Sequence, residues 1–174
     1  INSVLVRRLQ DGDLDGSQRR ALKAFPSQEI AQKILDSYFV EGGKTPTSSY
    51  KLSPMFQMKS SDFLLQLTIA ATFVEVWLAK EGHSGLVGLN LLEKIQLPNL
   101  AGLYGGMLAD VDYVVMGAGI PREIPGALDL LSQHLPARLK IPVEGAPPDS
   151  DFATELNPEV VMKGRLAKPL KRSE

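Results

Sequence analysis

The stretch MGAGIPREIPG at residues 116–126 stands directly behind the apolar run DYVVM at residues 112–116. This short apolar run rich in valine predicts a strand over DYVVMGAG (112–119), and the glycines at its end predict a turn. The segment IPREIPGALDLLSQH, which follows, has the spacing of a helix. Because the same order of strand, turn and helix recurs upstream, the sequence predicts βα units and a parallel sheet.

Working outward from this unit, LVGLNLL (86–92) is a second predicted strand and LPNLAGLYGGMLADV (97–111) the helix after it. Upstream, KLSPMFQM (51–58) and TFVEVWLA (72–79) are further strand candidates, with the helix-like LLQLTIAA between them. The first forty residues predict helices, with Ser27 as an N-cap.

Downstream of the 112–134 unit the pattern weakens. ARLKIPVEG (137–145) and DFATEL (151–156) are short strand candidates on either side of a loop at 145–151. RLAKPLKRSE (165–174) reads as a basic, unpatterned tail, and its few charges do not indicate a nucleic-acid partner.

Composition excludes several classes of function. The 174 residues carry 19 Lys and Arg against 20 Asp and Glu, with 6% aromatic residues, so neither charge nor stacking platforms favour nucleic acid. There are no cysteines, and His83 and His134 are too far apart to read as a metal pair. No apolar run has bilayer-spanning length and the start lacks a signal pattern, so we expect a soluble cytoplasmic protein with no membrane or metal partner.

The sequence matches neither of two common phosphate-binding motifs. The dinucleotide fingerprint G-x-G-x-x-G has Gly117 and Gly119, but Arg122 replaces its third glycine. The GGKT at residues 42–45 lacks the first glycine of the phosphate-binding loop, which is Tyr38 here, and a helix precedes it.

A glycine at the end of a strand removes the Cβ that would keep a flat ligand away from the backbone. Gly117 and Gly119 fit that role, and Pro121 suits the first turn of the next helix. In a parallel α/β barrel such strand ends form the active-site face. A tight βα turn without a ligand explains the same residues, and the spacing alone leaves both interpretations open.

Asn90 places an amide in an otherwise apolar strand. A buried amide without a hydrogen bond costs about 1–3 kcal/mol, so we expect it to have a partner. The edge of a flavin ring, with its alternating carbonyls and ring nitrogens, would supply one, and so would a neighbouring backbone group. Glu75 interrupts the predicted strand at 72–79, where we expect it to pair with a lysine or to face the barrel mouth.

The block from Phe73 to Gly126, with EGGK and SPMFQM ahead of it in the same order, resembles the nitronate monooxygenases, also called 2-nitropropane dioxygenases. The resemblance runs from about Ile34 to the end of the chain. It implies an FMN-containing (β/α)8 TIM-type barrel that oxidises alkyl nitronates with O2 to a carbonyl compound and nitrite. It also implies that residues 1–45 form a helical segment and residues 46–174 the N-terminal portion of that barrel.

The resemblance further implies which residues bind the cofactor. Pro54 and Met55 would end the first barrel strand against the flavin, and Asn90 would contact FMN from another strand end. Gly117, Gly119 and Pro121 would lie beside the isoalloxazine and the substrate, and a last implied contact to the flavin ring is Gln57.

A (β/α)8 barrel takes about 250 residues, so we expect these 174 residues to supply only part of one. In the family the catalytic-base histidine and the loop that grips the FMN phosphate come later, and neither His83 nor His134 fits the base. The segment alone would be inactive, and its open sheet edges would pair with the rest of the barrel or with another copy. Two alternatives remain: an FMN-dependent enoyl reductase that uses NAD(P)H, and an inactive barrel fragment that acts as an interaction module.

Overall fold

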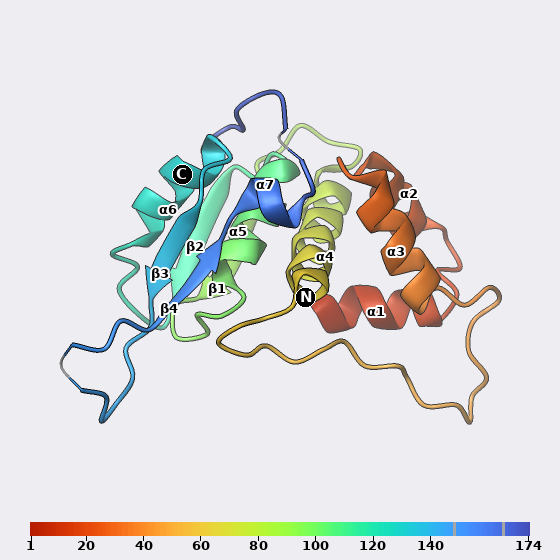
Figure 1. Ribbon diagram of the computed structural model, residues 1–174. Coiled ribbons are helices and arrows are strands. Elements are labelled where there is room, and N and C mark those ends of the chain that lie inside the picture. Colours follow the sequence, from red (N-terminus) through yellow and green to blue (C-terminus); the bar gives the residue numbers. More distant parts are fainter. Residues whose placement is uncertain (148, 165) are drawn as a thin grey trace.

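The computed structural model describes residues 1–147, 149–164 and 166–174. Its elements are, in chain order, α1 (Asn2–Gln10), α2 (Ser17–Ala24), α3 (Gln28–Tyr38), α4 (Asp62–Lys80), β1 (Gly88–Leu92), α5 (Asn99–Leu108), β2 (Tyr113–Gly117), α6 (Ile124–Ser132), β3 (Ala137–Lys140), β4 (Ala153–Leu156) and α7 (Pro158–Val161). Figure 1 shows α4 in the middle, with α1–α3 on one side of it and the strands on the other.

The three N-terminal helices confirm the helical prediction for the first forty residues. The Ser27 side chain accepts a hydrogen bond from the Ile30 N–H, as expected of the N-cap of α3. Leu5, Leu22 and Ile34 lie on the inner faces of α1, α2 and α3 and are almost fully buried. These helices therefore form a layer that covers one side of α4.

Helix α4 is the central element, and it corrects the strand predicted at residues 72–79. Ser61 caps its first turn, and no glycine or proline interrupts the 19 residues that follow. Because α1–α3 cover one side and α5 the other, α4 is apolar almost all round, which hides its helical period. Glu75 lies on a partly exposed strip, where it pairs with Arg8 at 3.1 Å.

By length and composition α4 is also the one helix within the described residues that could cross a membrane. However, 61% of its most apolar window is buried inside the protein. A buried core helix has the same composition, so this is weak evidence for a membrane span.

Helices α4 and α5 approach each other closely at Gly105. A Cβ at this position would overlap the carbonyl group of Ile69 in α4, 3.0 Å from its carbon. Gly102, one turn earlier on α5, would meet only side-chain atoms, at 3.7 Å or more. Gly105 therefore sets the distance between the two helices.

The strands form two separate sheets, and this overturns the predicted barrel. β1 pairs with β2 in parallel, from Gly88 opposite Tyr113 to Leu92 opposite Gly117, and β3 pairs with β4 antiparallel. The described residues thus hold seven helices and two sheets of two strands each, and no (β/α)8 barrel is evident among them. The strand predictions at 86–92 and 112–119 and their parallel pairing are confirmed.

The remaining predictions are those for residues 51–58 and for the C-terminal loop and tail. Residues 51–58 form no strand but an irregular segment, which includes Pro54, a residue that cannot donate a ladder hydrogen bond. The loop predicted at 145–151 and the basic tail predicted at 165–174 include Pro148 and Arg165, which lie outside the described residues.

Candidate functional site

The candidate site lies at the carboxyl ends of β1 and β2, and the two faces of this strand pair differ. Leu89 and Leu91 point toward α5, where a Cβ added at Gly106 or Gly102 would touch them. On the opposite face Val115 is 56% exposed and Tyr113 42% exposed. We call this second face, made by Gly88, Asn90, Leu92, Tyr113, Val115 and Gly117, the open face.

Asn90 and Gly117 lie together on the open face. A Cβ at Gly117 would meet Asn90 Oδ1 at 3.9 Å and Leu92 Cδ2 at 3.2 Å, so the glycine leaves the amide uncovered. Asn90 is exposed, not buried as its apolar neighbours suggested, and its side chain bonds to no other described residue. The amide is therefore free to bind a ligand without first breaking a protein hydrogen bond.

The turn after β2 holds an unusual backbone conformation. Ala118 has a φ of 59°, the left-handed region, whereas Gly117 and Gly119 on either side of it do not. Gly119 is instead a glycine because Glu93 packs over it, with the Glu93 Cβ only 2.8 Å from where a Cβ would stand. A non-glycine residue at positive φ costs about 1–2 kcal/mol, and such strain often marks a functional turn.

Pro121 was predicted to lie in the first turn of the next helix, but in the structure it lies three residues before the start of that helix. The Ile124 N–H donates to the Pro121 carbonyl at 3.3 Å in a preceding turn, and α6 starts at Ile124. Pro125 occupies the first turn of α6 in its place, because a proline there lacks only an N–H that needs no partner.

A cavity of about 430 Å3 opens at these strand ends. It is lined by the turn after β2, the start of α6, the loop after β1 and the end of β3, including Glu93, Gln96, Asn99, Pro121, Arg122, Glu123, Leu139 and Lys140. The Glu123 carboxylate accepts the Lys140 N–H at 2.8 Å, which ties the turn to β3. A cleft at the carboxyl ends of parallel strands is a common place for a ligand.

The charges in this cavity are mixed. Neither Arg122 nor Lys140 makes an ion pair with any described residue, so both cationic groups can meet an anionic ligand. Glu93 contributes a carboxylate close to Gly119. Sequence reasoning missed Lys140, because only tertiary packing brings β3 to this point.

The predicted cofactor residues of the 51–58 segment lie elsewhere. Pro54 and Met55 line a separate cavity of about 420 Å3, together with Thr68 and Thr72 of α4. Gln57 lines a third cavity, of about 300 Å3, beside β4. The structure thus groups Asn90 with Gly117 and places Gly119 and Pro121 just beyond them, but it does not bring the three residues from 54–57 to this cluster.

Both histidines are engaged away from the cavity. His83 lies in the turn after α4, with Nε2 at 2.6 Å from the Ala79 carbonyl and Nδ1 accepting the Gly85 N–H. His134 is buried, with Nδ1 at 2.8 Å from the Tyr104 hydroxyl and Nε2 at 2.8 Å from the Lys168 carbonyl. As expected from the sequence, neither is placed as a base for the strand-end site.

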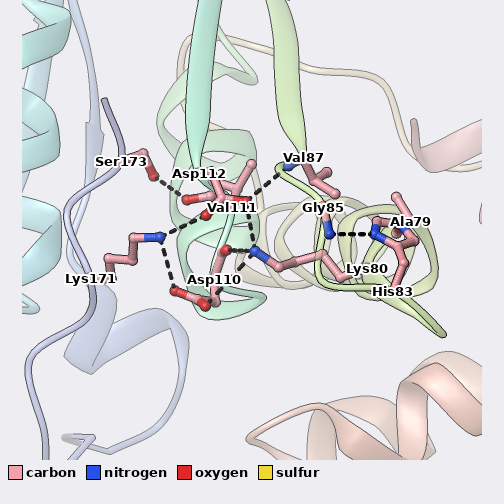
Figure 2. A network of polar contacts seen from close by, with 10 residues as sticks. All are labelled: Ala79, Lys80, His83, Gly85, Val87, Asp110, Val111, Asp112, Lys171 and Ser173. Carbon is pink, nitrogen blue, oxygen red and sulfur yellow. Dashed lines mark hydrogen bonds and ion pairs between the residues drawn. The ribbon is translucent and has the colours of Figure 1, made fainter.

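The opposite, amino ends of the same strands carry a polar network that the sequence did not reveal (Figure 2). Asp112, only 8% exposed, binds Lys171 Nζ at 2.7 Å, Lys80 Nζ at 2.8 Å and the Val87 N–H at 2.9 Å. These three donors, Lys171 foremost, hold the pKa of Asp112 well below its ordinary value. Lys80 comes from α4, Val87 and Asp112 directly precede β1 and β2, and Lys171 belongs to the C-terminal residues. The network therefore joins these four parts of the chain.

Comparison with models of known families, with curated proteins and with solved structures found no match for this chain.

Proposed function

We propose that this protein is a flavin-dependent oxidoreductase of the nitronate monooxygenase type, which oxidises alkyl nitronates with O2 to a carbonyl compound and nitrite. The observation that carries the proposal is the free Asn90 amide beside the Cβ-free Gly117 at the end of a parallel strand pair. The resemblance of residues 73–126 to that family, which includes both residues, also supports the proposal.

The residues at the strand ends fit one part of FMN, its isoalloxazine ring. Gly117 adds no side chain beside Asn90, and the Asn90 amide offers both a donor and an acceptor to the ring edge. Bound there, FMN would supply the electron transfer between the nitronate and O2. Arg122 and Lys140 would attract the anionic substrate into the adjoining cavity.

A nitronate is already the deprotonated form of a nitroalkane. Its oxidation therefore needs no base at the strand ends. This agrees with the positions of His83 and His134, which hydrogen-bond to backbone carbonyls away from this site. Deprotonation of a neutral nitroalkane would need a base from outside these residues.

The test is anaerobic mixing of the intact flavin-loaded protein with propionate-3-nitronate and, separately, with NADPH, followed by absorbance near 450 nm. We expect bleaching by the nitronate, and slower bleaching in Asn90→Ala but not in the exposed control Gln133→Ala. Rapid bleaching by NADPH alone would overturn the proposal and favour an enoyl reductase.

A second candidate function, an interaction module without flavin, is favoured by the exposed apolar side chains of the open face. Val115, Tyr113 and Leu92 are each more than a third exposed, and parallel strands are ordinarily covered on both faces. This candidate predicts a colourless protein that self-associates in light scattering and becomes monomeric in Val115→Lys. A yellow protein whose mass does not change in this variant would exclude it.

A further inference from the structure

The residue Glu174 lies beside β2, on the side of the strand that faces away from β1. Its N–H donates to the Asp112 carbonyl at 3.0 Å, and its carbonyl accepts the Val114 N–H at 2.7 Å. A residue that bonds in this way to both neighbours of Tyr113 has the hydrogen-bond pattern of a parallel strand pair, in register with Tyr113. Glu174 therefore holds the first position of a third parallel strand in the β1–β2 sheet.

Contacts just before Glu174 fix where the chain reaches the sheet (Figure 2). Ser173 is 0% exposed, and its hydroxyl donates to the Val111 carbonyl at 3.1 Å. Lys171 Nζ binds the Asp112 carboxylate at 2.7 Å. Because both partners directly precede β2, these contacts hold Glu174 at the start of that strand.

Beyond Glu174, the outer edge of β2 is unpaired among the described residues. The backbone groups of successive residues in a strand point alternately to its two sides. The Gly117 carbonyl accepts the Glu93 N–H on the β1 side at 2.9 Å, and the Val114 N–H points to the outer side. The groups of Met116 therefore also point outward, where no described residue bonds the Met116 N–H or the Val114 carbonyl. Such a row of unpaired groups is a template for a further strand.

This edge also lacks the devices that protect an exposed strand from pairing. Edge strands ordinarily carry charged side chains, proline or a bulge, and β2 with the sequence YVVMG has no charge and no proline. Strand β3, by contrast, carries Arg138 and Lys140, and the Glu123 carboxylate already accepts the Lys140 N–H. The composition of β2 is therefore that of a strand with neighbours on both sides.

We propose that the outer edge of β2 is a docking site for an extended strand joined to the chain at Glu174, which pairs with β2 in parallel. Its first and third residues would stand beside Val114 and Met116, whose side chains pack against the core, so both should be apolar. Its second residue would stand beside Val115 on the open face, where a polar side chain is suitable. The occupant is thus an extended segment with alternating apolar and polar residues.

The small number of free groups explains why this strand is joined to Glu174. The unpaired groups of Val114 and Met116 belong to only part of a five-residue strand. A separate peptide would have to offset its lost translational freedom with these few hydrogen bonds. A segment attached at Glu174 is already held beside the edge at a high effective concentration.

The test extends the intact protein after Glu174 by Val-Thr-Val-Thr, which places valine beside Val114 and Met116. We expect hydrogen exchange of the Met116 amide, followed by NMR, to slow about tenfold or more relative to the unextended protein. The Val115 amide faces β1 and should not change. The matched extension Val-Pro-Val-Thr should leave Met116 as in the unextended protein, because proline lacks the N–H that would donate to the Val114 carbonyl.

Two further measurements address other occupants of this edge. A free acetylated Val-Thr-Val-Thr peptide should not slow exchange of the Met116 amide, and protection equal to that of the extension would show that attachment at Glu174 is not needed. Protection of Met116 in the unextended protein that rises with protein concentration would assign the edge to a second copy of the chain. Either result refutes the proposal, as does equal Met116 exchange in the two extended proteins.

Discussion

On one face of the β1–β2 pair Leu89 and Leu91 pack against α5, whereas on the opposite face Asn90, Tyr113 and Val115 are exposed. Successive residues of one strand point to opposite faces, so the register of β1 against β2 decides which side chains lie on each face. The covered face is supported by α4 and α5 and should be intolerant of substitution. The open face contributes little to stability and holds the residues we associate with ligand binding.

The largest effect is expected from the support beneath the covered face. Gly105→Ala forces its Cβ into the Ile69 carbonyl group, so α4 and α5 must separate, and we expect a loss of about 3 kcal/mol or more in the free energy of unfolding. Gly102→Ala meets only ordinary contacts, and alanine favours a helix by about 1 kcal/mol. Urea denaturation should separate the two variants; equal stabilities would show that α4 and α5 do not meet at Gly105.

The next comparison sets one face directly against the other. Leu89→Ala leaves a cavity beneath the strand and should cost about 2–5 kcal/mol. Val115→Ala, on the open face, should change the free energy of unfolding by no more than about 0.5 kcal/mol. A Val115 effect as large as that of Leu89, measured in the same denaturation series, would mean that something already covers the open face.

A smaller effect concerns the polar network at the amino ends of the strands. Folding lowers the pKa of Asp112, so the ionised carboxylate stabilises the folded state. This stabilisation is fully present above the unfolded-state pKa of about 3.9, and it is lost as pH falls toward the lower folded-state pKa. Asp112→Asn should therefore be less stable than the wild type at pH 7, and the gap should narrow below about pH 4. A gap that is constant between pH 7 and pH 2 would contradict this account of Asp112.

The smallest effect is expected at the strained turn. Ala118→Gly removes the cost of a left-handed alanine and should stabilise the fold by up to about 1 kcal/mol. Ala79→Gly, at an exposed position of α4, should destabilise it by a similar amount. If both substitutions destabilise equally in thermal unfolding, Ala118 does not carry the strain.

Local patterns predicted the parts of the fold that local chemistry decides. The strands at 86–92 and 112–119 stand between turn-forming residues, and Ser27 marks the start of α3, so each could be read from a few neighbouring residues. The segment at 72–79 could not, because helices on both sides of α4 make its sequence apolar all round. The barrel expectation failed for a related reason: which strands pair is decided by tertiary contacts.

The same limit applies to the candidate site. Asn90, Gly117 and Gly119 were found because an amide and glycines stand out at a strand end. The strained residue proved to be Ala118, and the Lys140 side of the cavity depends on how β3 packs against the turn. Pro54, Met55 and Gln57 were assigned through the resemblance alone, and they line other cavities.

The most direct test of the open face as a flavin-binding surface is the quenching of FMN fluorescence by the intact protein. The account predicts saturable quenching by the wild type and by the exposed control Gln133→Ala, and clearly weaker binding by Asn90→Ala and Val115→Asp, which alter the open face. Wild-type affinity in both open-face variants, or no quenching by any of the proteins, would contradict it.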